Sequence, residues 1–290
     1  YEISTRAWSS DVCSSDLACG VALFCASASA QTNRPPASPV AQPVMVEADR
    51  FFDEYARAAG FLEKGGRQQA AVVMDQLYKS LRTTPWLEIA LLKSSELYEG
   101  SSPTTATDGY DLLAKRIANA PYFLGNQQRS RLFGAALQTA VDRGVSRVKL
   151  ARIRDGLSRY FARYMQYPES LAKLSIFNYV DAGDIVDANN RPFRYLPTGM
   201  QMRPTITYLR YELESIPKEP FIATSPKLVG TSKVNEDPEQ YVCLIRVPGK
   251  GEPVRISEEQ TIEGYYVAVI ASRGAVLVGG NRVIVLPVRQ

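Results

Sequence analysis

The sequence contains no histidine. This absence removes the commonest general base, the Ser-His-Asp and Cys-His catalytic arrangements, and the commonest metal ligand. Cysteine is almost as scarce, because three of the four cysteines lie within the first 25 residues and only Cys243 lies beyond them. A lone cysteine cannot form an intramolecular disulfide, and a zinc site of the Cys/His kind needs more ligands. We therefore expect no cofactor, no metal ion and no catalytic residue.

Long hydrophobic runs and clusters of charge are also missing. The apolar stretch ACGVALFC at residues 18–25 is shorter than the roughly 20 residues that cross a bilayer. The net charge is only +4, and the densest basic run, residues 143–163, alternates with apolar residues. That pattern predicts the hydrated face of a helix rather than a nucleic-acid-binding surface. With 45% hydrophobic and 22% charged residues, the chain is expected to be globular.

The N-terminal 44 residues are expected to contribute nothing to the folded core. Residues 1–17 resemble a translated sequencing adapter, through the run WSSDVCSSDL. Residues 18–30 read as the rear of a signal peptide, because Ala28-Ser29-Ala30 before Gln31 fits the A-x-A cleavage rule. We therefore expect cleavage after Ala30 and a periplasmic or otherwise exported chain without a membrane span. Residues 31–44 hold four prolines and are predicted to form a linker.

Residues 45–145 are predicted to form helical hairpins. Apolar residues recur at helical spacing in six segments, near residues 47–64, 67–81, 85–98, 103–120, 127–142 and 146–166. Thr84-Pro85 and Ser102-Pro103 each suggest a capping residue followed by proline at the first helical position, and Gly144 suggests the end of the fifth helix. The six helices would form three hairpins, repeating every 38 to 41 residues or so.

One of these hairpins loosely resembles a tetratricopeptide unit. The resemblance rests on Gly65, Ala70, Leu77, Tyr78 and Pro85. Arrays of that family stack into a concave protein-binding surface, so the resemblance implies an interaction role. A plain helical bundle without a groove is the alternative.

Residues 146–214 combine the sixth helix with strands. After the helix come the following residues: Tyr167, Pro168, Asp187, Pro192, Phe193 and Tyr195. In this order they resemble the soluble part of the major pseudopilin of type II secretion, although Ala188-Asn189-Asn190 replaces the family's Pro-Trp-Gly core. The resemblance implies that a long helix packs on its own strand, and it gives these six positions a structural role. The spacing of Asp181, Asp184 and Asp187 could suit calcium, but EF-hand ligand order is missing, so we expect a hydrated acidic turn.

Residues 227–290 are predicted to form a small β-sandwich-like domain. Alternating segments at 227–232, 240–247, 254–256, 265–272, 275–278 and 283–288 are joined by glycine-containing turns. Their order resembles the homology region of type II secretion protein C and the pilus-assembly protein P. Gly264, Val267 and Ile270 fill the Gly-x-x-Val-x-x-Ile pattern of those families. The resemblance implies docking on a secretin.

The expected fold class is α+β, with an N-terminal helical-hairpin array followed by a small C-terminal antiparallel β-domain. The expected function is that of a non-enzymatic bacterial envelope protein that binds other proteins, as an accessory of a type II secretion or type IV pilus-like system. A secretin or an inner-membrane platform component is the expected partner, and nucleic acid is not. Two alternatives remain open: a free-standing structural or binding exoprotein, and a secreted hydrolase that uses Glu212, Glu214, Asp184 and Asp187.

Overall fold

The computed structural model describes residues 41–118, 122–123, 126–203, 206–223, 225–236, 239–247, 249, 251–279 and 282–288. The chain divides into two units, Tyr1–Ser38 and Pro39–Gln290, and everything below concerns the second. The adapter-like residues 1–17, the predicted signal peptide at 18–30 and the linker up to residue 40 lie outside the described residues. The linker prediction is wrong at its end, because helix α1 already begins at Ala41. Pro43 fits there, since the first turn of a helix needs no amide donors.

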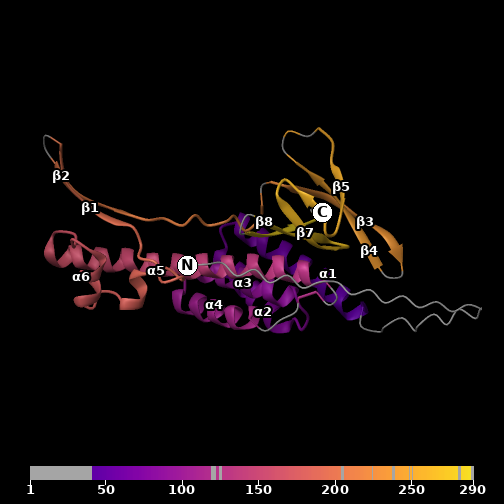
Figure 1. The fold of residues 1–290 in the computed structure, drawn as a ribbon, viewed down its shortest axis with the longest axis horizontal. Helices are drawn as coiled ribbons and strands as arrows, with labels where there is room; N and C mark the ends of the chain where they lie inside the picture. The colour runs from indigo at the N-terminus through magenta and orange to yellow at the C-terminus, as the bar shows by residue number, and fades with distance from the viewer. Residues whose placement is uncertain are drawn as a thin grey trace, which may run out of the picture. The chain divides into compact units, whose positions relative to one another are not determined.

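Four helices form the two hairpins that the sequence predicts. They are α1 (Ala41–Glu63), α2 (Arg67–Ser80), α3 (Trp86–Tyr98) and α4 (Pro103–Ile117), and each contacts the next (Figure 1). Gly65, two residues after the end of α1, has φ 79°, the left-handed conformation that glycine tolerates at a helix end. Pro103 occupies the first turn of α4 with Ser102 as its N-cap, which confirms that prediction. Thr84 does not cap α3, because Pro85 is the N-cap residue and the helix begins at Trp86.

Helix α3 is the central element of the helical layer. Every residue from Trp86 to Leu97 is buried, including the ionisable Glu88, Lys93 and Glu96. A helix that is apolar or paired on all faces needs neighbours all round it. Here α2, α4 and the long helix α5 (Gln127–Tyr164) contact α3 directly.

The predicted third hairpin does not exist. Helix α5 runs without interruption through Gln127–Tyr164, so the predicted break at Gly144 is wrong. A Cβ atom at position 144 would overlap the ring of Tyr110 on α4, and glycine therefore serves helix packing at this point. Met165, in the left-handed conformation at φ 55°, is the residue that ends the helix.

The segment after α5 folds back on the C-terminal part of that helix. It contains the short helix α6 (Leu171–Ile176), the 3-10 turn η1 (Ala182–Ile185) and an antiparallel hairpin of β1 (Tyr195–Arg203) and β2 (Ile206–Leu213). Buried side chains of α5 and of residues 171–193 form a separate hydrophobic cluster: Leu150, Ile153, Leu157, Tyr160, Leu171, Leu174, Val180 and Phe193. The long helix thus packs against the residues that lead into its own strand.

Two antiparallel sheets follow. Strands β3 (Lys227–Glu236), β4 (Glu239–Arg246) and β5 (Val254–Ser257) form one, in the order β3-β4-β5. Strands β6 (Thr261–Ile262), β7 (Tyr265–Ala271), β8 (Gly274–Gly279) and β9 (Arg282–Pro287) form the other, in the order β6-β7-β8-β9. The six predicted strands are confirmed, and β6 is additional. Of the predicted turns, Lys250, Gly280 and Asn281 lie outside the described residues.

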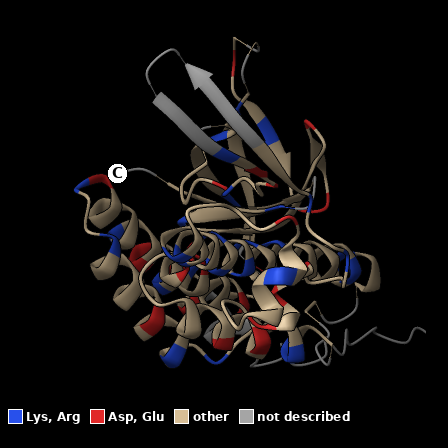
Figure 2. Cartoon of the chain, turned by 90° about the vertical axis from the view of Figure 1, so that its left-hand side faces the viewer, with Lys and Arg blue, Asp and Glu red and all other residues tan. Residues whose placement is uncertain are grey.

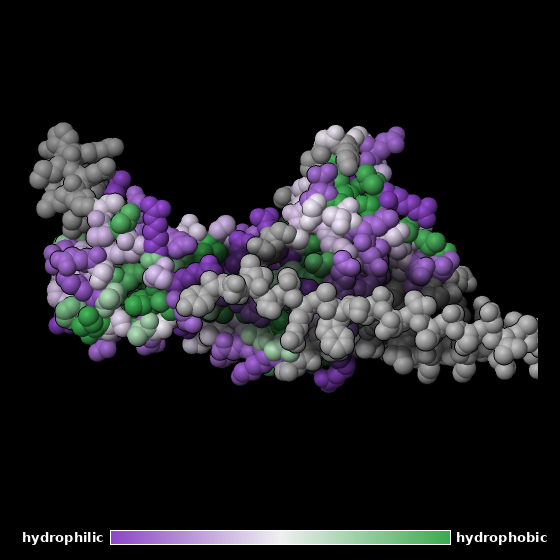
Figure 3. Space-filling model, viewed as in Figure 1, coloured by the Kyte–Doolittle hydropathy of each residue, from purple (hydrophilic) through white to green (hydrophobic). Residues whose placement is uncertain are grey.

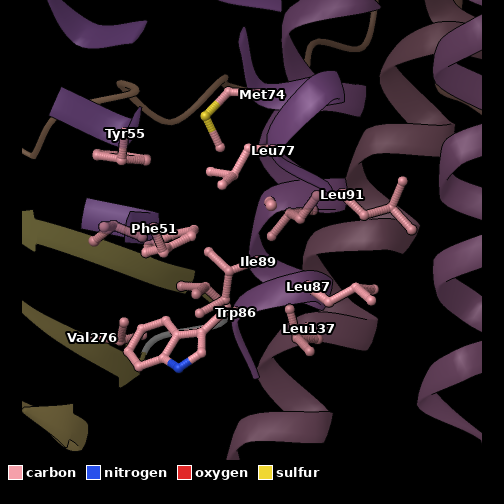
Figure 4. Packing of buried hydrophobic residues seen from close by; sticks show 14 of the residues in the cluster. Phe51, Tyr55, Met74, Leu77, Trp86, Leu87, Ile89, Leu91, Leu137 and Val276 are labelled. Atoms are coloured by element: carbon pink, nitrogen blue, oxygen red, sulfur yellow. The ribbon is translucent and has the colours of Figure 1, made fainter. Parts of the chain in front are cut away.

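The β6–β9 sheet is buried on both faces. One face packs on the β3–β5 sheet around Cys243, Ile245, Val267 and Leu277. The other face of this sheet packs against the helices, and its Val276 lies in the same hydrophobic cluster as Trp86 and Phe51 (Figure 4). Helices, four-stranded sheet and three-stranded sheet are therefore three successive layers, and the fold class is α+β. No helix among the described residues is long and apolar enough to cross a membrane.

Candidate functional site

The aromatic residues of the pseudopilin-like segment come together at the C-terminal part of α5. The Tyr195 hydroxyl donates a hydrogen bond to the carbonyl of Pro168 at 2.8 Å. The rings of Tyr167 and Tyr211 lie 4.8 Å apart in an edge-on arrangement, and Phe193 is buried in the cluster described above. These contacts hold the strand entry against the helix.

The aspartates of the acidic turn have separate partners. Asp187 Oδ1 accepts from the backbone amides of Asn189 at 2.8 Å and Arg191 at 2.7 Å, which closes the loop that brings Val186 opposite Pro192. Asp184 is buried and forms an ion pair with Arg152 at 3.1 Å. The prediction of a hydrated acidic turn is therefore wrong for Asp184. Within the described ranges, no group of three or more ligand side chains is placed to hold a metal ion.

The candidate acids of the hydrolase alternative are not assembled into one pocket. Glu214 accepts a hydrogen bond from the amide of Arg194, and Glu212 lies in β2 opposite Leu196 of β1. Asp184 and Asp187 have the structural partners given above. Each of these carboxylates supports a local turn, ion pair or hairpin.

The basic run at 143–163 is largely occupied by internal contacts. Arg147 pairs with Glu99 at 2.6 Å, Arg154 bonds the carbonyl of Glu214, and Arg159 bonds that of Tyr179. The predicted hydrated face is therefore wrong for Arg147, whose side chain is only 12% exposed. Figure 2 shows cationic and anionic residues interspersed along the helices rather than gathered in a single-sign patch.

Of the three positions singled out in the β-domain, Gly264 directly precedes strand β7, and Val267 and Ile270 lie within it. Gly264 has φ 79° in the turn between β6 and β7, which explains the need for glycine. Val267 and Ile270 are buried and face the β3–β5 sheet. Ile270 has a second role, because it lines a large cavity.

This cavity, of about 920 Å³, lies where the helical layer meets both sheets. Its volume is within the range of ligand-binding pockets. The α2–α3 connection and the start of α3 supply one wall, the segment before α5 a second, and the ends of β4, β5 and β7 the rest. The side chains used below are Arg82, Trp86, Tyr122, Arg129, Tyr241 and Glu258.

Three lining residues carry a buried donor without a hydrogen-bond partner. These donors are Trp86 Nε1, Tyr122 Oη and Arg129 Nε. Trp86 is 1% exposed and Tyr122 is 5% exposed. Because an unsatisfied buried polar group costs about 1–3 kcal/mol, such groups are rare in folded proteins. These three atoms have almost no accessible surface, so they lie behind the cavity wall, and a ligand acceptor would reach them only if neighbouring side chains moved.

Ionised groups at the cavity are held in a short chain of contacts. Arg129 lies 4.1 Å from the ring centroid of Phe123 and pairs with Glu258 at 3.1 Å. Glu258 in turn accepts from the backbone amide of Ile270 at 2.7 Å. Burial raises the pKa of Tyr122, and the charge of Glu88 adds to the effect, so its hydroxyl stays a neutral donor at physiological pH.

Sequence patterns do not point to this cavity. Its lining comes from separate stretches, and no local spacing links them: residues 82–86, 122–123, 129, 234, 239–242, 257–259 and 269–270. The one usable signal is Trp86, since Trp8 is the chain's only other tryptophan. No protein-family model, curated protein or solved structure matches the chain.

Proposed function

We propose that the chain is an exported, non-enzymatic protein of the bacterial envelope that binds a segment of another protein in the cavity beside Trp86. The observation that carries this proposal is the cavity of about 920 Å³ between the helical layer and the two sheets, whose lining includes aromatic side chains and charged side chains of both signs. A polypeptide carries a backbone donor and acceptor at nearly every residue as well as varied side chains, so it can match such a mixed lining.

The lining also suits a polypeptide in its mixture of apolar and charged groups. Phe123, Val234 and Tyr241 offer apolar surface, whereas Arg82, Glu239 and Glu258 offer both signs of charge. Deep binding sites for protein segments combine aromatic anchors with a charged rim in this way. A secretin or an inner-membrane platform component of a type II secretion or type IV pilus-like system is the partner we propose, from the two family resemblances.

Site-specific crosslinking tests this proposal. Tyr241 would be replaced by p-benzoylphenylalanine in the full chain, expressed in its native bacterium, and the crosslinked partner identified by mass spectrometry. We expect a secretin or platform protein, and we expect Trp86→Phe or Tyr122→Phe in the same chain to reduce its yield. Both changes remove only the donor group or ring edge, which limits damage to the core.

Two controls define the result. The photoreactive residue placed at Tyr164, whose side chain is exposed at the end of α5, should not capture the same partner. Tyr78→Phe, which removes a hydroxyl from the helical layer outside the cavity, should leave the yield unchanged. Equal capture from both positions, or capture of no protein by a folded chain, would contradict the proposal.

A further inference from the structure

The cavity opens at an edge of strand β7. Val269 belongs to the helical core and Ile270 to the core between the two sheets, so their side chains lie on opposite faces of the strand. Both nevertheless line the cavity. A space that touches both faces of a strand must pass along one of its edges. The other edge of β7 is taken, because β8 pairs along it from Tyr266 to Ala271.

This edge is paired over only part of its length. Strand β6 meets β7 at Tyr265 and Tyr266, and the turn before β6 extends the pairing to Val267 through hydrogen bonds with Glu259 and Gln260. Beyond that point, no described strand pairs with residues 268–271 on this side. Four residues of strand correspond to roughly 13 Å of open edge. Open edges recruit strands from other chains.

A side chain takes the place of a strand at this edge. The amide of Ile270 donates to Glu258 Oε1 at 2.7 Å, where a neighbouring strand would offer a backbone carbonyl. Glu258 is only partly buried, with 34% of its side chain exposed, so an incoming chain can displace it. Once displaced, the carboxylate still has Arg129 as a partner at 3.1 Å.

We propose that the cavity receives an extended segment of the partner protein as an added strand on the edge of β7, where a carbonyl of that segment replaces Glu258 as the acceptor for the Ile270 amide. This inference rests on the proposed function, and it specifies how the partner is recognised: by its backbone. Trp86, Tyr122 and Arg129 line the cavity opposite this edge and would form the helical wall beside the added strand.

A pair of blocked peptides tests strand addition on the full chain. The probe is an acetylated and amidated hexapeptide of alternating threonine and valine, and its control carries N-methyl groups on alternate residues, which remove the donors needed for pairing. In a Trp8→Phe background Trp86 is the only tryptophan, so its emission reports on the cavity. We expect the probe to bind saturably, with a dissociation constant of about 1 mM or lower. The methylated control should bind at least roughly tenfold more weakly.

A matched pair of variants tests the role of Glu258. Glu258→Ala removes the competing acceptor and should tighten probe binding by roughly tenfold. Glu252→Ala removes an exposed carboxylate of the β4–β5 connection, outside the cavity lining, and should leave the affinity unchanged. The amide resonance of Ile270 should shift when the probe binds.

The outcomes separate this inference from the proposed function. Equal binding of both peptides would overturn strand addition while leaving the cavity as a binding site for protein segments. Failure of the unmodified probe to bind the Glu258→Ala chain, with unchanged thermal unfolding, would also overturn it, because backbone pairing should be tolerant of sequence. Crosslinking at Tyr241 tests the proposed function independently of either result.

Discussion

The ring of Tyr110 on α4 lies against the bare Cα of Gly144 on α5, in the space that a side chain at position 144 would fill. This close approach allows the Tyr110 hydroxyl to donate a hydrogen bond to Glu99 at 2.6 Å, just beyond the end of α3. Arg147, one turn after Gly144 on α5, pairs with the same carboxylate. Three helices therefore meet at one largely buried carboxylate, whose side chain is 9% exposed.

Gly144→Ala should destabilise the fold although alanine is the better helix former. Overpacking costs about 1–3 kcal/mol, and the helix-propensity gain offsets about 1 kcal/mol of that. We expect the free energy of unfolding in urea to fall by on the order of 1–2 kcal/mol. Gly60→Ala in α1 is the control, because no atom lies within 4 Å of a Cβ there. That variant should gain about 0.5–1 kcal/mol, and a loss of similar size in both would refute the packing argument.

Glu99 should make the stability of the fold depend on pH. Burial raises its pKa, but the hydrogen bond and charge of Arg147, the charge of Lys218 and the Tyr110 hydroxyl outweigh burial, so the pKa is lowered. A carboxyl with a depressed folded-state pKa contributes its full stabilisation above its ordinary pKa near 4.5. That contribution is lost as pH falls through the lower folded-state pKa. Urea titrations between pH 7 and pH 3 would measure this loss.

Glu99→Gln should remove that pH dependence and destabilise the chain at pH 7. Breaking a buried ion pair costs roughly 3–5 kcal/mol, and glutamine retains an acceptor, so we expect about 3 kcal/mol. Glu63→Gln, at the exposed end of α1, should change neither quantity. A parallel pH profile in wild type and Glu99→Gln would show that other groups dominate acid unfolding.

Cys243 should react very slowly in the folded chain. Its side chain is fully buried, and burial raises the pKa of its thiol to about 11 from the usual 9.0. The thiolate, which is the reactive form, should therefore be about 100-fold rarer at pH 8 than in an exposed thiol. Iodoacetamide labelling of a chain with serine at Cys13, Cys19 and Cys25 would measure this rate. Rapid labelling without denaturant would contradict the burial of Cys243.

The β-strands should not fold as an independent domain. Val269, Val276, Val278, Val283 and Val285 lie on the face of the β6–β9 sheet that joins the helical core. A fragment of residues 227–290 would expose this apolar face and should aggregate or bind hydrophobic dyes. Residues 41–290 should stay monomeric and unfold in one transition by both circular dichroism and Trp86 fluorescence. A soluble, well-dispersed fragment spectrum would contradict this expectation.

Periodicity and turn residues reveal most of the elements in this chain. The helical spacing before Gly65-Gly66 and the alternation around Cys243 each identify a real helix or strand. Gly144 misleads because its helix-weakening effect is local and about 1 kcal/mol, whereas the contact that requires it comes from Tyr110, 34 positions earlier. Local preference is a weak guide wherever tertiary packing decides.

The candidate cavity is the least predictable part. Trp86, Tyr122 and Glu258 meet only because the β6–β9 sheet packs on α1 and α5, and that packing has no signature in any one stretch of sequence. The contact between the Tyr195 hydroxyl and the Pro168 carbonyl is different, since it joins residues only 27 apart in one aromatic-rich stretch. Contacts over short separations can leave a local pattern in the sequence, whereas contacts between distant segments leave none.

Surface apolar residues also gather where α5 ends. Tyr164, Met165, Ile176 and Phe177 are all exposed there, and hydrophobic residues interrupt the hydrophilic surface at that end of the helices in Figure 3. The rings of Tyr164 and Phe177 lie 6.0 Å apart. Such a group is too small to identify a partner.

The unbroken course of α5 constrains how this chain can change in length. Its 38 residues extend on the order of 57 Å and serve two hydrophobic clusters in turn. One residue gained or lost between Val148 and Leu150, where the two clusters meet, would turn everything beyond by about 100° around the helix axis. Only changes of whole helical repeats, about seven residues at a time, would restore the phase. Insertions and deletions in this helix should therefore be tolerated only in such multiples.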